Sequence, residues 1–106
     1  MSTTSETLSS AIVTIDLAAL QYNYKTLAAQ AYARSPTTET GAAIKGEAYG
    51  LGLEPSAKAL WAAGCRSFFV ARPFEGAQLR AILPDALIFV LDGLYDGQAD
   101  YYLAHE

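Results

Sequence analysis

Lys45 has the clearest potential for chemistry, because it follows a short apolar run and precedes a glycine-rich turn. Tyr49 follows four positions later, and Gly50 and Gly52 flank a leucine just behind it. A lysine at the rim of a buried strand is partly desolvated, which disfavours the ammonium form and leaves an amine that attacks carbonyl groups. The tyrosine offers a phenol donor nearby, and the glycines permit close backbone approach to a ligand.

A helix predicted to begin near Pro55 adds a place for an anion, since proline suits the first turn of a helix and helix N-termini attract negative charge. Lysine, phenol, turn and helix start together would suit a phosphorylated aldehyde. Taken alone, each feature is weak evidence. A lysine at the end of a strand is most often simply solvated, and a Gly-x-Gly pair is common in ordinary βα turns. The Gly-x-Gly pair is also no dinucleotide fingerprint, because the third glycine is missing.

The elements that must position these residues alternate between strand and helix. Apolar runs predict strands over residues 11–15, 42–45, 67–71 and 86–91. Helices are predicted to begin after Asp16, near Pro55, at Pro73 and from about residue 98. The uninterrupted apolar runs at 67–71 and 86–91 indicate strands covered on both faces. Strict alternation of this kind is typical of βα units in a parallel sheet.

Two α/β architectures fit this order, namely a doubly wound open sheet and a (β/α)8 TIM-type barrel. Both place their chemistry at the carboxyl ends of strands, where Lys45, Arg72 and Asp92 stand. A whole barrel takes about 250 residues, so this chain would form only the first part of an incomplete barrel. Arg72 and Asp92 are interpreted as solvated rim charges, and Cys65 as a small buried residue near a helix–strand turn.

Composition and charge narrow the classes of protein. The 106 residues suffice for one small domain, and a hydrophobic content of 52% can supply its core. A net charge of -4 argues against a nucleic-acid partner or an anionic membrane. No run approaches the roughly 20 apolar residues of a membrane span, and residues 1–10 are expected to be a flexible tail rather than a secretory signal. A single cysteine allows no internal disulfide, which favours a reducing, cytoplasmic compartment.

The order of residues 44–52, IKGEAYGLG, resembles the pyridoxal-phosphate attachment motif of alanine racemases, which typically reads Val/Ile-Lys-Ala-Asp/Asn-Ala-Tyr-Gly-x-Gly. The resemblance extends to the flanking elements. Residues 13–27 are similar to the family's opening strand and helix, residues 53–80 to its next helix, strand and helix, and residues 83–94 to its third barrel strand. Residues 11–106 are therefore identified as part of an alanine racemase N-terminal barrel domain.

This resemblance implies a fold type III pyridoxal 5'-phosphate enzyme, an isomerase that interconverts L- and D-alanine for D-alanine biosynthesis and cell wall precursors. It implies that Lys45 carries the cofactor as a Schiff base and transfers protons, that Tyr49 contacts the phosphate, and that Leu91 packs near the pyridine ring. A homodimer is expected for the full-length enzyme. The opening β segment of such enzymes can also pair outside the barrel.

Two positions depart from the family motif, and the length raises a separate question. Gly46 stands where alanine is usual, and Glu47 stands where aspartate or asparagine is usual. The second catalytic base of the family is a tyrosine from the partner's C-terminal domain, so these 106 residues alone are expected to be inactive. The alternatives are a decarboxylase or pyridoxal-phosphate carrier on the same barrel, a non-catalytic remnant, and a small pyridoxal-phosphate-binding α/β protein.

Overall fold

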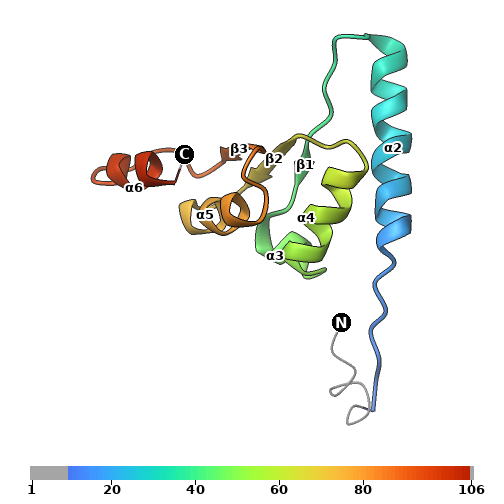
Figure 1. Ribbon diagram of the computed structural model, residues 1–106, viewed down its shortest axis with the longest axis horizontal. Helices are drawn as coiled ribbons and strands as arrows, with labels where there is room; N and C mark the ends of the chain where they lie inside the picture. Colours follow the sequence, from blue (N-terminus) through green and yellow to red (C-terminus); the bar gives the residue numbers. More distant parts are fainter. Residues whose placement is uncertain (1–9, 106) are drawn as a thin grey trace.

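The protein, seen in a computed structural model that describes residues 10–105, has three parallel strands joined by helices (Figure 1). The predicted tail over residues 1–10 lies almost wholly outside the described residues. The elements in chain order are α2 (Leu17–Arg34), β1 (Ala42–Ala43), α3 (Lys45–Tyr49), α4 (Leu53–Ala62), β2 (Ser67–Val70), α5 (Pro73–Ile82), β3 (Leu87–Val90) and α6 (Ala99–Ala104).

The sheet confirms the predicted parallel βα units. Its strand order is β1-β2-β3, and both pairings are parallel. Ala43 lies opposite Phe69, and Phe69 lies opposite Phe89, so the three strands share one lateral row. Helix α4 connects β1 to β2, and α5 connects β2 to β3. Because parallel strands carry their carboxyl ends at one edge, the segments that follow β1, β2 and β3 are brought together there.

Helix α2 begins where its sequence predicts. The Asp16 side chain caps it by accepting a hydrogen bond of 3.0 Å from the Ala19 N–H. The helix stands beside α4 (Figure 1), and the Gln21 side chain donates to the Ala59 carbonyl across this contact. No α2 residue is fully buried, so the helix rests on the domain through half-buried side chains such as Leu20 and Tyr24.

The core lies between the sheet and the helices on one of its faces. Phe68 and Val70 of β2 are fully buried there, together with Leu79 of α5. Helix α5 approaches the sheet closely at Gly76, where an added Cβ would stand 3.5 Å from a Val90 methyl carbon. A Cβ at this position would make ordinary van der Waals contact with the sheet, so the helix packs closely here without requiring a glycine.

The opposite face of the sheet is open among the described residues. Leu87 and Phe89 of β3 are exposed, and the Phe89 ring stacks on Phe69 with 5.0 Å between ring centroids. The expectation that both faces of residues 86–91 are covered is therefore wrong for β3. The uniformly apolar sequence of β3 therefore does not show that both of its faces are buried. The described helices lie on one face only, and alternate side chains of β3 point away from them.

Two predicted strands also need correction. Residues 11–15 form no strand, and Ile12 and Val13 are exposed because no described strand pairs with them. β-branched side chains favour a strand only where a neighbouring strand supplies hydrogen bonds and packing. The strand predicted over 42–45 ends at Ala43, and Lys45 lies beyond it in α3.

Within residues 10–105, no helix combines the length and the hydropathy that a membrane crossing requires.

Candidate functional site

Lys45 opens a left-handed turn at the carboxyl end of β1. Residues 46–49 have φ between 55° and 61°, and Gly50 continues the turn with φ of 88°. Such a conformation costs roughly 1–2 kcal/mol for each residue that carries a Cβ. Strained backbone of this kind persists only where surrounding contacts hold it, and it is concentrated at functional sites. Glycines at residues 46 and 50 reduce this strain at both ends of the turn.

Contacts on several sides hold the turn. Ile44 and Ala48 bury their side chains in the core, and the Ala48 N–H donates to the Ile44 carbonyl over 2.9 Å. The Gly46 N–H donates to the Glu75 carboxylate of α5 over 2.8 Å. The Glu47 carboxylate accepts from the Leu53 N–H at the start of α4 over 3.2 Å. The turn is therefore tied to the core and to both following helices.

An open pocket surrounds the lysine and has a volume of about 390 Å³, within the range of roughly 300–1,000 Å³ typical of small-ligand sites. Lys45 is half-buried at its edge, and Tyr49 is 66% exposed. The structure thus places Lys45 and Tyr49 at one pocket. Its lining residues are Lys45, Gly46, Tyr49, Ala71, Arg72, Phe74 and Glu75.

Arg72 lines the pocket although its sequence position alone did not assign it to the site. It directly precedes α5 and is exposed, as a rim charge would be, but it lines the same pocket as Lys45. Two cationic side chains around one pocket favour a ligand that carries an anionic group, since guanidinium groups bind phosphate and carboxylate well. The available signal was the position of Arg72 just after a strand in the same parallel sheet.

Leu91 and Asp92 follow β3, farther along the same edge. The Leu91 N–H donates to the Val70 carbonyl, and the Asp92 N–H donates to the Ala71 carbonyl over 3.0 Å. Both residues are exposed, and neither is among the described residues that line the Lys45 pocket. The β2–β3 register, extended by one residue, places Leu91 beside Ala71, which does line it. Leu91 therefore stands one strand away from the pocket.

The helix start that borders the pocket differs from the predicted one. Helix α4 does contain Pro55 in its first turn, but none of its residues line the pocket. Its Leu53 N–H is already bound by the Glu47 side chain. Helix α5 borders the pocket through Phe74 and Glu75 instead. Because β1 and β2 lie side by side in parallel, the end of β2 and the start of α5 are brought to the lysine.

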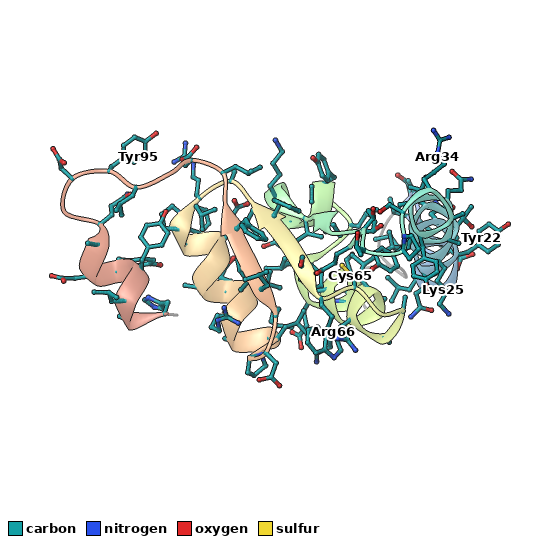
Figure 2. All side chains as sticks on the ribbon, turned by 90° about the horizontal axis from the view of Figure 1, so that it is seen from above. Tyr22, Lys25, Arg34, Cys65, Arg66 and Tyr95 are labelled. Atoms are coloured by element: carbon teal, nitrogen blue, oxygen red, sulfur yellow. The ribbon has the colours of Figure 1, made fainter. Side chains whose placement is uncertain are left out.

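Cys65 lies away from this pocket, buried in the turn between α4 and β2 as predicted (Figure 2). Its thiol donates to the Ser67 carbonyl over 3.3 Å. Burial raises the pKa of the Cys65 thiol, which makes it a poor nucleophile. Within residues 10–105, no three histidine, cysteine, aspartate or glutamate side chains are arranged to hold a metal ion.

Comparison with known families decides which proteins share this arrangement. The family described as alanine racemase, N-terminal domain, matches residues 15–106. The chain belongs to this family. It is 49% identical over 92 residues to the alanine racemase of Methylobacterium nodulans, covering 87% of this chain and 24% of that protein. It is 48% identical over 87 residues to the alanine racemase of Brucella ovis, covering 81% of this chain and 21% of that protein.

Solved structures of alanine racemases share the fold. That of the Bartonella henselae enzyme, with covalently bound pyridoxal phosphate, has a TM-score of 0.72 and 41% identity over 82% of this chain and 23% of that chain. The biosynthetic enzyme of Pseudomonas aeruginosa has a TM-score of 0.68 and 33% identity over 85% of this chain and 24% of that one. The chain spans about a quarter of the length of these relatives. Its parallel βα units correspond to part of the TIM-type barrel of the N-terminal domain.

Proposed function

We propose that this chain is the cofactor-attaching N-terminal part of a pyridoxal-phosphate-dependent alanine racemase, which interconverts L- and D-alanine. The observation that carries the proposal is that Lys45, Tyr49 and Arg72 line one pocket at the carboxyl edge of the sheet. Family membership and the covalently bound pyridoxal phosphate of the Bartonella henselae enzyme support the same assignment. A cytoplasmic location and a homodimer of the whole enzyme form part of the proposal.

The residues of the pocket fit this cofactor chemically. Pyridoxal phosphate combines an aldehyde, which an amine can bind covalently, with a phosphate dianion, which hydrogen-bond donors and cations stabilise. The pocket offers the Lys45 amine, the Tyr49 phenol and the Arg72 guanidinium. The turn is open at its glycines, because no other part of the protein lies within 4 Å of a Cβ built at Gly46 or Gly50. When bound, the cofactor supplies an electron sink that makes the substrate α-proton removable.

Each of the three side chains has a distinct role in this proposal. The Lys45 amine would hold the cofactor and, in its free neutral form, would remove or return the α-proton on one face of the substrate. Tyr49 donates a hydrogen bond to the phosphate, and Arg72 lowers the free energy of the anion by its charge. Leu91, one strand away, would lie near the ring of the cofactor.

The 106 residues by themselves are proposed not to racemise alanine. Racemisation requires a proton donor and acceptor on each face of the α-carbon. Lys45 and Tyr49 belong to one turn, and we infer that this pair does not supply the second base for the opposite face. Chiral chromatography of alanine incubated with the loaded chain would detect racemisation and contradict this part of the proposal.

Borohydride reduction followed by peptide mapping tests the attachment. The chain is incubated with pyridoxal phosphate, reduced and digested, and the label is expected on Lys45. Lys25 on α2 and Lys58 on α4 are internal controls, the latter paired with Glu54 over 2.7 Å. Lys45→Arg should abolish the label because a guanidinium does not bind the aldehyde usefully. A label on Lys25 or Lys58 instead, or one that persists in Lys45→Arg, would show that the assignment is wrong.

A further inference from the structure

Glu75 binds three backbone N–H groups at once at the edge of the pocket. Its Oε2 accepts from the Gly46 N–H over 2.8 Å, and its Oε1 accepts from the Ala71 and Arg72 N–H groups over 2.9 Å each. One carboxylate therefore links the turn that carries Lys45 to the end of β2. Hydrogen bonds from backbone N–H groups to an ionised carboxylate are roughly twice as strong as those between neutral groups.

The local role of Glu75 accounts for only two of these bonds. It stands at the third position of α5, where a glutamate commonly reaches back to the N–H of the capping residue. The bonds to Ala71 and Arg72 are of this kind, since both donors lie within four residues of Glu75. Capping gives no reason for the bond to Gly46, which lies 29 residues away in another βα unit.

The third bond acts at the peptide that adjoins Lys45. The Gly46 N–H belongs to the peptide plane between Lys45 and Gly46, so its direction constrains the backbone ψ of Lys45 and thereby the path of its side chain. Gly46 is also where the chain enters the left-handed conformation. Glycine has the widest choice of backbone conformations, so an external contact is needed to select one.

We propose that Glu75 is a positioning residue that holds Lys45 in place for the cofactor by fixing the Lys45–Gly46 peptide against the end of β2. This inference rests on the proposed function of Lys45. The carboxylate does not need to touch the cofactor for this role. It requires acceptor oxygens on both sides, and this requirement distinguishes glutamate from its amide.

Glu75→Gln is the decisive variant. The amide keeps the size of the side chain and an oxygen that can cap α5, but its NH₂ group cannot accept from the Gly46 N–H. Glu75→Asp provides a second variant that keeps the charge and shortens the reach by one methylene. Glu54→Gln is the matched control, because it also removes a carboxylate from the first turn of a helix, at an exposed position whose charge pairs with Lys58.

Two readouts on the full chain separate the role of Glu75 from the function of Lys45. Amide hydrogen exchange of Gly46 needs no cofactor, and the extent of borohydride labelling of Lys45 at limiting pyridoxal phosphate measures attachment. Loss of one charge-assisted hydrogen bond is expected to accelerate Gly46 exchange by about tenfold or more in Glu75→Gln and Glu75→Asp. Lys45 labelling should fall by a similar factor in both variants, while their helix content stays that of the wild type. The Glu54→Gln control should show wild-type Gly46 exchange and wild-type Lys45 labelling.

The outcomes are distinguishable. Unchanged Gly46 exchange and Lys45 labelling in both Glu75 variants would overturn the positioning role even if the wild-type chain is labelled. Faster exchange with full labelling would also overturn it, because the turn would then be held without effect on the lysine. Absence of label on wild-type Lys45 would overturn the proposed function instead, and the positioning role with it, while the exchange data would still show whether Glu75 holds Gly46. If Glu75→Gln does not fold, Glu75→Asp decides by the same two measurements.

Discussion

At the scale of single residues, the site joins Lys45 and Tyr49 from one turn to Arg72 and Glu75 from the next βα unit. The first pair could be identified from order and spacing in the sequence. The second pair approaches the lysine because β1 and β2 lie side by side in parallel. Arg72 and Glu75 contribute differently. The arginine adds positive charge to the pocket, whereas the glutamate carboxylate accepts hydrogen bonds from backbone N–H groups.

Tyr49→Phe should weaken cofactor retention more than any later chemical step. The change would delete the hydrogen bond to a charged phosphate that we propose for Tyr49, worth roughly 1.5–3 kcal/mol, and so should raise the dissociation constant for pyridoxal phosphate by about tenfold to a hundredfold. Equilibrium dialysis measures this directly. Tyr22→Phe is the control, because Tyr22 is exposed on α2 and points away from the rest of the protein (Figure 2). An equal loss in both variants would contradict a phosphate contact by Tyr49.

Glu75 should also make stability depend on pH in the acid range. Partial burial raises the pKa of Glu75, but hydrogen bonds from Gly46, Arg72 and Ala71 and the Arg72 charge outweigh it, so the pKa lies below its ordinary value of 4.5. A lowered pKa stabilises the folded state above pH 4.5, and this contribution is lost as pH falls through the lowered pKa.

The measurement is the free energy of unfolding by urea between pH 7 and pH 3. Wild type should lose more stability on acidification than Glu75→Gln, whose side chain does not titrate. Glu54→Gln should follow the wild-type curve, because the carboxylate that it removes is exposed and makes only a surface ion pair of small energetic value with Lys58. Parallel curves for wild type and Glu75→Gln would show that the carboxylate contributes no such stability.

At the scale of elements, the left-handed turn is the feature that separates this βα connection from an ordinary one. Gly46 stands where the family usually has alanine. Gly46→Ala should be tolerated, because nothing lies within 4 Å of the added Cβ, at a cost of roughly 1–2 kcal/mol from the left-handed conformation. Urea unfolding measures that cost, and the chemical shifts of the Phe69 ring should stay unchanged.

Gly41→Ala provides the contrasting variant next to β1. Its added Cβ would stand 2.7 Å from a Phe69 ring carbon and 3.0 Å from the Ser67 carbonyl oxygen. Overpacking of this kind costs typically 1–3 kcal/mol and should displace the Phe69 ring from Phe89. If Gly41→Ala leaves the Phe69 ring shifts unchanged, or Gly46→Ala alters them, the two glycines do not play these different roles.

At the scale of the whole molecule, the helices cover one face of the sheet and leave the other open. Leu87 and Phe89 of β3 expose apolar side chains on this face, and Leu91 just after the strand is exposed as well. In a complete barrel such side chains fill the interior. We propose that residues 11–106 form one partial barrel domain whose open face and strand edges favour self-association.

Replacing Leu87 and Phe89 together with threonine should raise the monomer fraction of the chain, because it removes the largest exposed side chains of β3. Sedimentation velocity at several protein concentrations measures the distribution. Leu94→Thr is the control, since it removes an exposed leucine from the loop after β3. A wild-type chain that is a clean monomer with a sharp cooperative melt would contradict this prediction.

The sequence by itself determined the features that depend on residues close to one another along the chain. Asp16 and Pro73 begin helices because a cap and a fixed φ act within one turn, and the apolar runs before Lys45 and Arg72 predict strands. The order of residues around Lys45 was enough to identify the family. Strict alternation of strand and helix was enough to predict the parallel sheet.

Only the tertiary structure decided the features that depend on register and on contacts between distant segments. The bond from Gly46 to Glu75 requires β1 and β2 to lie in one particular register. The left-handed path of residues 46–49 is unfavourable for most residues in isolation, so no local propensity predicts it. The open face of β3 could likewise not be predicted from its uniformly apolar sequence. An apolar side chain can be buried, but the neighbouring elements decide whether it is.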